Sequence, residues 1–98
     1  MAKQHHPITP ARIAALHKIR DSFAGIEAAA QRARLINAIQ SLQHVSTFEA
    51  SRFLDVYHAP ARKLELIREG YPIETTMRHV LTEAGKQHRV GVYYLAKG

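Results

Sequence analysis

The sequence contains no cysteine, which excludes disulfide bonds and metal sites built from thiolates. Long hydrophobic runs are also missing, because no stretch approaches the roughly 18 apolar residues of a membrane-spanning helix. The segment 1–10 lacks the apolar core of a signal peptide. From these absences we expect a soluble protein that acts inside the cell.

Acidic residues are scarce, with 8 Asp and Glu against 14 Lys and Arg, and the formal net charge is +6. Such a charge favours a polyanionic partner without identifying it. The 98 residues suffice for one domain. A hydrophobic content of 46% with 22% charged residues is typical of a globular chain rather than a disordered one.

Signatures of catalysis and of metal binding are absent as well. No nucleophile motif, glycine-rich phosphate loop or clustered carboxylate pair is present, so we expect no enzyme activity and no cofactor. The seven histidines show no ligand spacing on a shared element apart from one adjacent pair, and we expect no metal site. They are His5, His6, His17, His44, His58, His79 and His88.

A first helix is predicted after a flexible arm at residues 1–8, which shows no periodicity. Thr9 is its expected N-cap and Pro10 its first residue, since the missing N–H of proline costs nothing there. Apolar residues then recur every three or four positions, and at Gly25 a break is favoured over a bend in one long helix. These apolar residues are Ile13, Leu16, Ile19 and Phe23.

A second helix is predicted over 27–42, because its alanines and long unbranched side chains lose little entropy in a helix. Its expected flanks are Gln31, Arg32 and Arg34, and residues 43–45 form a short link to the next segment. Its apolar stripe is Ala29, Ala33, Ile36 and Ile39, with Leu35 and Leu42 beside it.

The segment 46–70 predicts two short helices joined by a tight turn. Ser46 precedes Glu49 by three residues, the spacing of a capping box at a helix start. After the turn at 55–57, a second helix is expected near His58, because Pro60 suits a first helical turn and Gly70 a helix end. The pattern is that of a helix-turn-helix, which places its second helix in the DNA major groove, although generic helical hairpins share it.

Beyond Gly70 the apolar pattern changes from helical to alternating. Residues 73–81 and 89–94 are candidate strands, separated by a loop at 82–87 that contains Gly85. They predict a β-hairpin that lies against the helices, because an isolated hairpin is marginal in water. The predicted fold class is therefore mainly α with a C-terminal β-hairpin, a winged helix-turn-helix.

Candidate nucleic-acid-binding residues gather at the helix-turn-helix and around the hairpin loop, where a winged helix meets bases and flanking phosphates. Basic residues on an amphipathic helix are about as often only a solvated face, so the hypothesis depends on their joint placement. His79 and His88 lie beside the loop, and Glu83 opposes its charge. The candidates are Ser46, Thr47, Tyr57, His58, Arg62, Lys63, Arg68, Arg78, Lys86, Gln87 and Arg89.

The sequence does not decide which side of the second helix of this pair packs against the core. Helical geometry places Arg62, Glu65 and Glu69 on one side, and part of that side is expected to pair internally or to face solvent. Leu66 points away from the clearest apolar stripe. That stripe is Pro60, Leu64 and Ile67.

The chain resembles a family of small helix-turn-helix domains found mainly in bacteriophages and prophages, over the segments QRARLINAIQ, STFEASRFLDVYHAPARKLELIREGYPIET and GKQHRVGVYYL. The resemblance covers residues 31–95. It implies a winged-helix DNA-binding domain in which Arg62 is a recognition-helix arginine. The next position is usually apolar in the family and is Lys63 here. The other matches include Ala33-Arg34-Leu35, Thr47, Glu49-Ala50, Leu66, Glu69-Gly70-Tyr71, Ile73 and His88-Arg89-Val90.

We therefore expect a sequence-specific double-stranded DNA-binding protein, a phage-type transcriptional regulator in the bacterial cytoplasm and nucleoid. The expected organisation is one domain over 9–98, with a helical extension at 9–30 that completes the core or forms a homodimer interface. One alternative is a winged helix that binds and inhibits a host enzyme or defence complex. Another is an accessory factor of phage recombination or replication.

Overall fold

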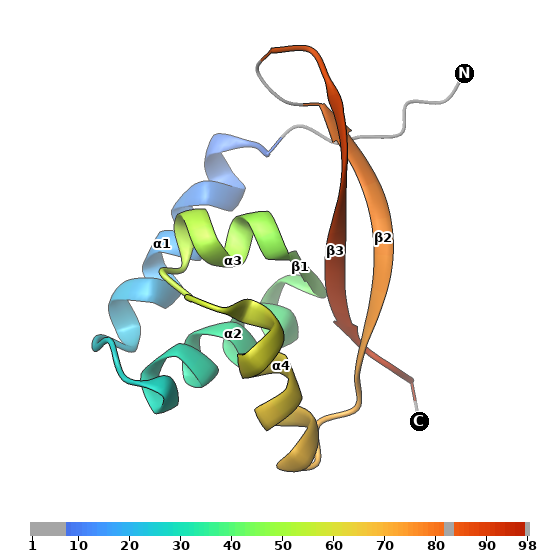
Figure 1. Ribbon diagram of the computed structural model, residues 1–98. Helices are drawn as coiled ribbons and strands as arrows, with labels where there is room; N and C mark the ends of the chain where they lie inside the picture. The colour runs from blue at the N-terminus through green and yellow to red at the C-terminus, as the bar shows by residue number, and fades with distance from the viewer. Residues whose placement is uncertain (1–7, 82–83, 98) are drawn as a thin grey trace.

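The computed structural model describes residues 8–81 and 84–97, which form four helices and three strands (Figure 1). The predictions of four helices followed by a β-hairpin are confirmed, whereas residues 1–7 of the expected arm and Thr82 and Glu83 of the loop lie outside the described part. In chain order the elements are α1 (Pro10–Ser22), α2 (Ala28–Leu42), β1 (His44–Ser46), α3 (Thr47–Phe53), α4 (Ala59–Arg68), β2 (Ile73–Leu81) and β3 (Gln87–Leu95).

The helix starts have the caps that the sequence predicted. Thr9 Oγ1 accepts a hydrogen bond from the N–H of Arg12 at 3.1 Å. At α3, Ser46 Oγ accepts from the N–H of Glu49, and the Glu49 carboxylate accepts from the N–H of Ser46, each at 3.0 Å. The expected break between α1 and α2 lies at Gly25, whose φ of 126° suits glycine.

The sheet contains a strand that the sequence analysis missed. The strand order is β1-β3-β2, and both pairings are antiparallel. The segment 43–45 was expected to be only a link, but His44–Ser46 pairs with β3, and Val45 is fully buried opposite Tyr93. Three residues are too few to show an alternating pattern in the sequence. The strand forms because the edge of β3 has backbone groups with which it can pair.

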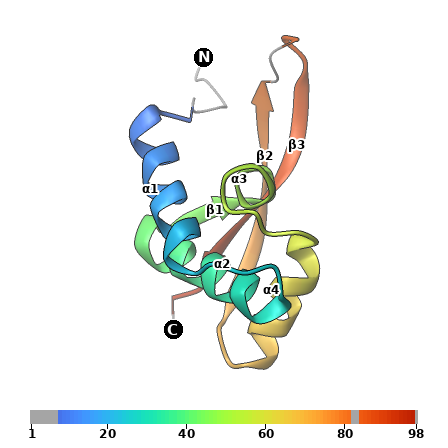
Figure 2. The same ribbon diagram turned by 90° about the vertical axis from the view of Figure 1, so that its left-hand side faces the viewer.

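Among the described residues, the apolar cluster lies between the helices and the sheet, whose arrangement Figure 2 shows. Seen in this view, α3 lies end-on between α1 and the β2–β3 hairpin. Leu35 and Ile39 of α2 contribute to the cluster, together with Leu54 after α3 and Leu66 of α4. The hairpin extends beyond the helices at one end, which is visible in both ribbon views. No helix in the described part of the chain is long and apolar enough to cross a membrane.

The orientation of α2 about its axis differs from the sequence prediction. The orientation of α4 decides a question that the sequence left open. In α2 the buried side is turned away from Ala29, which is exposed, toward Gln31 and Arg34, so their assignment to the flanks was wrong. In α4 the inward residue is Leu66, which is 1% exposed, whereas the stripe of Pro60, Leu64 and Ile67 is exposed. The leucines of α4 therefore point to opposite sides.

Candidate nucleic-acid interface

The turn between α3 and α4 is held by two buried polar side chains of α2. Arg34 donates hydrogen bonds to the carbonyl oxygen of Asp55 at 2.9 Å, and to those of Phe23 and Gly25 at 2.5 and 2.8 Å. Gln31 Oε1 accepts from the N–H of Tyr57 at 2.8 Å. Both donors and acceptors in loops need partners when they are removed from water. These contacts fix the turn, and with it the position of α4.

Sequence reasoning missed Gln31 and Arg34, although a signal was present. Gln31 precedes Leu35 by four positions and Ala38 by seven, so it lies on the same helical stripe as two apolar residues that are fully buried. Arg34 lies three positions after Gln31 and beside Leu35. Polar residues within such a stripe predict buried hydrogen bonds to loops.

An ion pair between Arg12 and Glu49 connects α1 to α3. Arg12 Nε donates to Glu49 Oε2 at 2.6 Å, and Arg12 Nη2 donates to Glu49 Oε1 at 3.1 Å and to the carbonyl oxygen of His44 at 2.6 Å. Burial alone would raise the pKa of the Glu49 carboxyl, but the hydrogen bonds from Arg12 and Ser46 outweigh it and lower the pKa. The same carboxylate thus caps α3 and binds α1.

The exposed side of α4, here called the outer face, consists of Pro60, Leu64 and Arg68, which are spaced by four residues and lie on one side of the helix. Leu64 is 46% exposed. Tyr57, which is 50% exposed, lies in the turn just before the helix. The outer face is thus apolar toward the N-terminal end of α4 and basic at its C-terminal end.

Beside the outer face, four charged side chains form a network between α2 and α4. Glu65 lies 2.8 Å from Arg62 and 3.0 Å from Arg32, and Arg32 also lies 3.0 Å from Glu69. The hydrogen bond from Arg32, followed by that from Arg62, lowers the pKa of the Glu65 carboxyl. The sequence left self-pairing or exposure to solvent open for this side, and the structure shows self-pairing. The network pairs both acidic residues of the helix with arginines.

Lys63 connects α4 to the hairpin on the other flank. Its Nζ donates to Thr75 Oγ1 at 3.1 Å and lies 5.3 Å from the centroid of the Tyr93 ring. The ring face attracts the ammonium group electrostatically. Burial raises the pKa of the Tyr93 hydroxyl, because the charged form would lose water. Lys63 therefore packs toward the sheet rather than along the outer face.

The hairpin presents one of its faces on the side of α4. Residues directly opposite each other in an antiparallel pair share a face, and the faces alternate along each strand. Thr75 pairs with Tyr93, and His79 pairs with Arg89, so all four lie on the same face. Because Lys63 contacts Thr75 and Tyr93, Arg89 and His79 also lie on the α4 side, farther along the hairpin.

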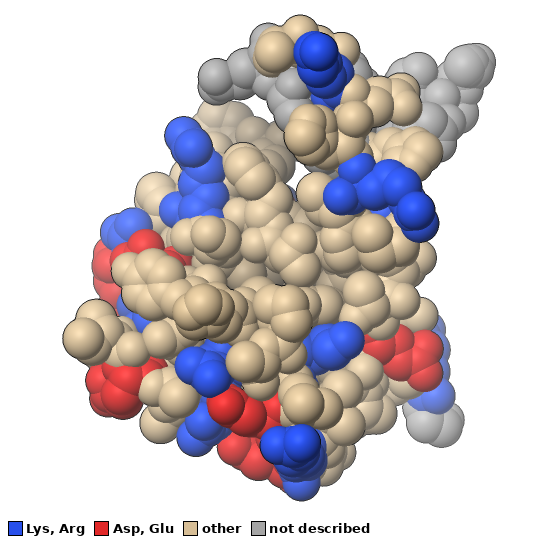
Figure 3. Space-filling view, in the orientation of Figure 1, with Lys and Arg blue, Asp and Glu red and all other residues tan. Residues whose placement is uncertain are grey.

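The space-filling view shows the side of the molecule that carries α3, α4 and the hairpin (Figure 3). Lys and Arg side chains lie on the hairpin and around α4, and uncharged residues cover the surface between them. Asp and Glu side chains are adjacent to the basic ones near α4. A cation-flanked, mostly uncharged surface of this kind is compatible with a polyanion whose charges lie at its edges.

A family model described as a winged helix-turn-helix domain matches residues 30–98. The chain belongs to the winged helix-turn-helix domain family. A search of curated proteins found no match to the chain. Membership confirms the predicted fold class, mainly α with a C-terminal hairpin, and suggests DNA binding, because the fold commonly places its second helix in the major groove.

In winged-helix terms, α4 is the recognition helix and the β2–β3 hairpin is the wing. Five sequence candidates are exposed. Two of them lie just before α4, one lies in its last turn, and two lie on the wing face toward α4. Lys86, in the loop of the wing, is exposed too. The five candidates other than Lys86 are Tyr57, His58, Arg68, Gln87 and Arg89.

The remaining candidates are placed differently. Arg62 is only 16% exposed in its side chain and is paired with Glu65, and Lys63 contacts the wing. Arg78 pairs with Val90 and so lies on the wing face opposite to Arg89. Their contacts with nucleic acid stay predictions, and Arg62 would have to leave its ion pair to reach a base.

Ser46 and Thr47 lie at the start of α3, next to the base of the wing. The Ser46 hydroxyl is occupied by the cap of α3. The Thr47 methyl group approaches Gly91 of β3 closely, since a Cβ at Gly91 would lie 3.5 Å from it. Their predicted role in phosphate binding is not decided by these contacts.

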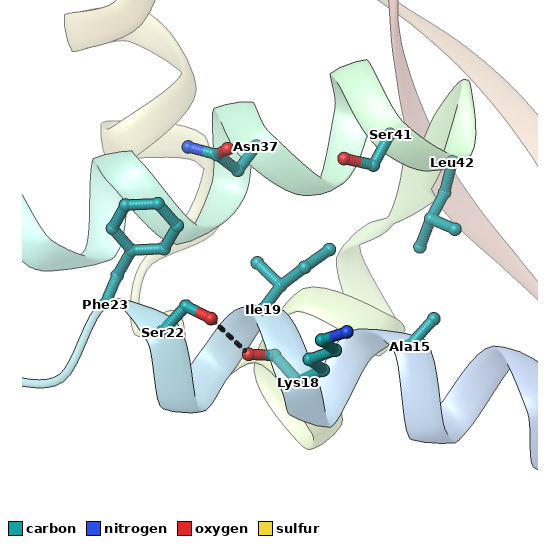
Figure 4. Close-up of a pocket in the computed structure, with 8 residues that line it drawn as sticks. All are labelled: Ala15, Lys18, Ile19, Ser22, Phe23, Asn37, Ser41 and Leu42. Carbon is teal, nitrogen blue, oxygen red and sulfur yellow. Dashed lines mark hydrogen bonds between the residues drawn. The ribbon is translucent and has the colours of Figure 1, made fainter.

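A groove of about 430 Å³ lies apart from these elements, between α1 and α2 (Figure 4). Ile19, Phe23 and Leu42 supply apolar walls, and Ser22 Oγ donates to the carbonyl oxygen of Lys18 within α1. None of its lining residues belongs to α3, α4 or the wing. Within residues 8–81 and 84–97, no group of three or more potential ligands could hold a metal ion.

Proposed function

We propose that this chain is a sequence-specific double-stranded DNA-binding protein of phage type that regulates transcription. In this proposal α4 enters the major groove, and the wing follows the neighbouring sugar-phosphate backbone. The observation that carries it is that exposed basic residues lie both in the last turn of α4 and on the wing face that Lys63 contacts, namely Arg68 and Arg89. The resemblance to phage and prophage domains supports the phage-type assignment.

The charge distribution supports contact with phosphates. The two acidic residues of α4 are paired with Arg32 and Arg62, so their charge is neutralised beside the proposed interface. Arg68 and Arg89 are exposed at the two ends of that interface. A net charge of +6 further favours association with a polyanion.

A titration of duplex DNA at several salt concentrations tests the proposal. We expect the logarithm of the binding constant to fall linearly with that of the salt concentration, with a slope of about −0.9 for each phosphate contact. Arg89→Ala should weaken binding to all sequences and reduce the slope by about 1. Lys97→Ala, an equal loss of charge just after β3, should change neither quantity. Binding that is insensitive to salt, or equal effects of both substitutions, would contradict the proposal.

The regulator is further proposed to act as a homodimer on paired half-sites, with α1 contributing to the subunit contact. The groove between α1 and α2 lies apart from α4 and the wing, so a second copy there would leave both free for DNA. Sedimentation equilibrium of the protein without DNA checks this, and a monomer at all concentrations that permit DNA binding would exclude a preformed dimer.

A second candidate function is a winged helix that binds a protein, such as a host enzyme or defence complex. The exposed apolar residues on α3, α4 and β2 favour it, namely Phe48, Leu64, Ile67 and Met77. A pull-down from nuclease-treated bacterial lysate discriminates between the candidates, because only a protein partner is retained after the nucleic acid has been digested.

A further inference from the structure

Apart from Arg68 in its last turn, the outer face of α4 lacks the side chains that usually read base edges by hydrogen bonding. Guanine is most often recognised by arginine or lysine, and adenine by asparagine or glutamine. Before the last turn of α4, the outward positions are Pro60 and Leu64, and both are exposed. Arg68 follows only in the last turn.

The two basic residues nearest to Leu64 in sequence are engaged at the flanks of the helix. Arg62 is paired with Glu65 at 2.8 Å, and its Nε is buried. Lys63 donates to Thr75 and lies over the ring of Tyr93. The outer face of α4 therefore exposes apolar carbon near Leu64, because both cations have partners in other directions.

The one apolar group that B-DNA presents in its major groove is the C5-methyl group of thymine. We propose that the outer face of α4 recognises thymine methyl groups, with Leu64 and Pro60 as the contacting residues and Tyr57 beside them. This inference rests on the proposed function, and it adds the chemical feature by which the chain selects its site. Contact with a methyl group removes apolar surface of both partners from water, which favours binding.

The surroundings of the face favour DNA over an apolar protein surface as its occupant. Arg68 continues the outer face, and Arg89 is exposed on the wing face that Lys63 contacts. Figure 3 shows that basic side chains border the uncharged area on the hairpin and around α4. A thymine methyl in the groove is likewise bordered by phosphates on both strands, so the distribution of charge is complementary.

Binding to thymine and deoxyuridine duplexes tests the inference, because deoxyuridine lacks only the methyl group. The best-binding duplex is first selected from a random pool, and a copy is made in which deoxyuridine replaces every thymine. For the unmodified protein we expect the copy to bind about fourfold more weakly for each contacted methyl, the effect of burying one methylene-sized group. For Leu64→Ser the difference in affinity between the two duplexes should be smaller than for the unmodified protein.

Ile26→Ser is the matched control, because Ile26 is 81% exposed in the link between α1 and α2. This variant should keep the full preference for thymine, and circular dichroism verifies that both variants are folded. Equal affinity of the unmodified protein for both duplexes, with binding still dependent on salt, overturns the thymine inference alone. An unchanged thymine preference in Leu64→Ser also overturns it. Failure to bind any duplex at low salt overturns DNA binding itself.

Discussion

Replacing Arg34 by methionine should destabilise the fold strongly, because this one guanidinium connects three segments. It is 2% exposed and donates to carbonyl oxygens of Phe23, Gly25 and Asp55. The first two oxygens lie in the link between α1 and α2, and the third lies in the turn before α4. Methionine keeps most of the length and apolar volume of the side chain but provides no donor.

The expected loss of unfolding free energy is about 2–4 kcal/mol. Each hydrogen bond to a charged group contributes about 1.5–3 kcal/mol. The sum is reduced because Gly25 and Asp55 are exposed residues whose carbonyls can accept from water instead. It is reduced further because Arg34 Nε is buried without a partner among the described residues, so methionine also relieves a desolvation cost.

Urea unfolding and thermal melting followed by circular dichroism measure this loss. For a chain of this size, it corresponds to a fall in Tm of roughly 10–25 °C. Arg52→Met is the matched control, because Arg52 is exposed on α3, and it should change the stability by less than about 0.5 kcal/mol. If Arg34→Met were no less stable than Arg52→Met, the three hydrogen bonds would not hold the link and the turn.

Three further substitutions test the packing of α1 and of α4. Glu49→Gln should be less stable than the unmodified protein above pH 4.5, the ordinary pKa of the carboxyl, and the difference should shrink as the pH falls through the lowered pKa of the folded state. Urea unfolding from pH 3 to 7 checks this, and a difference independent of pH would refute the role of the Glu49 charge. Leu66→Ala should cost about 2–5 kcal/mol, whereas Leu64→Ala should cost much less, because only Leu66 is buried. Similar losses in the same unfolding assay would mean that α4 packs in another orientation.

The local elements could be predicted because their signals are local. A Thr-Pro pair, a Ser to Glu spacing of three and an alternating run each reflect interactions between residues close in sequence. The capping box at Ser46 and Glu49 therefore has the predicted geometry. What the pattern omitted is that the Glu49 carboxylate also binds Arg12, 37 positions away in the chain. Such a contact is set by the tertiary packing of α1, which no local spacing encodes.

The rotation of α2 and α4 about their axes was harder to predict for a different physical reason. Burial of Gln31 and Arg34 conflicts with the rule that polar residues face water, and it becomes favourable only because loop carbonyls and an N–H supply hydrogen bonds. In α4, Leu64 and Leu66 are chemically identical and point in opposite directions. Composition alone cannot decide which of them is the core residue.

The same ambiguity explains why the structure places some candidate site residues differently from the sequence prediction. The sequence predicts DNA contacts around the second helix from His58, Arg62, Lys63 and Arg68, and two of these, Arg62 and Lys63, lie in the first half of the helix. Packing Leu66 inward turns these two side chains to the flanks, where Glu65 and Tyr93 engage them. The same rotation exposes Leu64. A helix with this orientation can contact DNA bases without its central cations, provided that the bases present apolar groups and that Arg68 and the wing contact the phosphates.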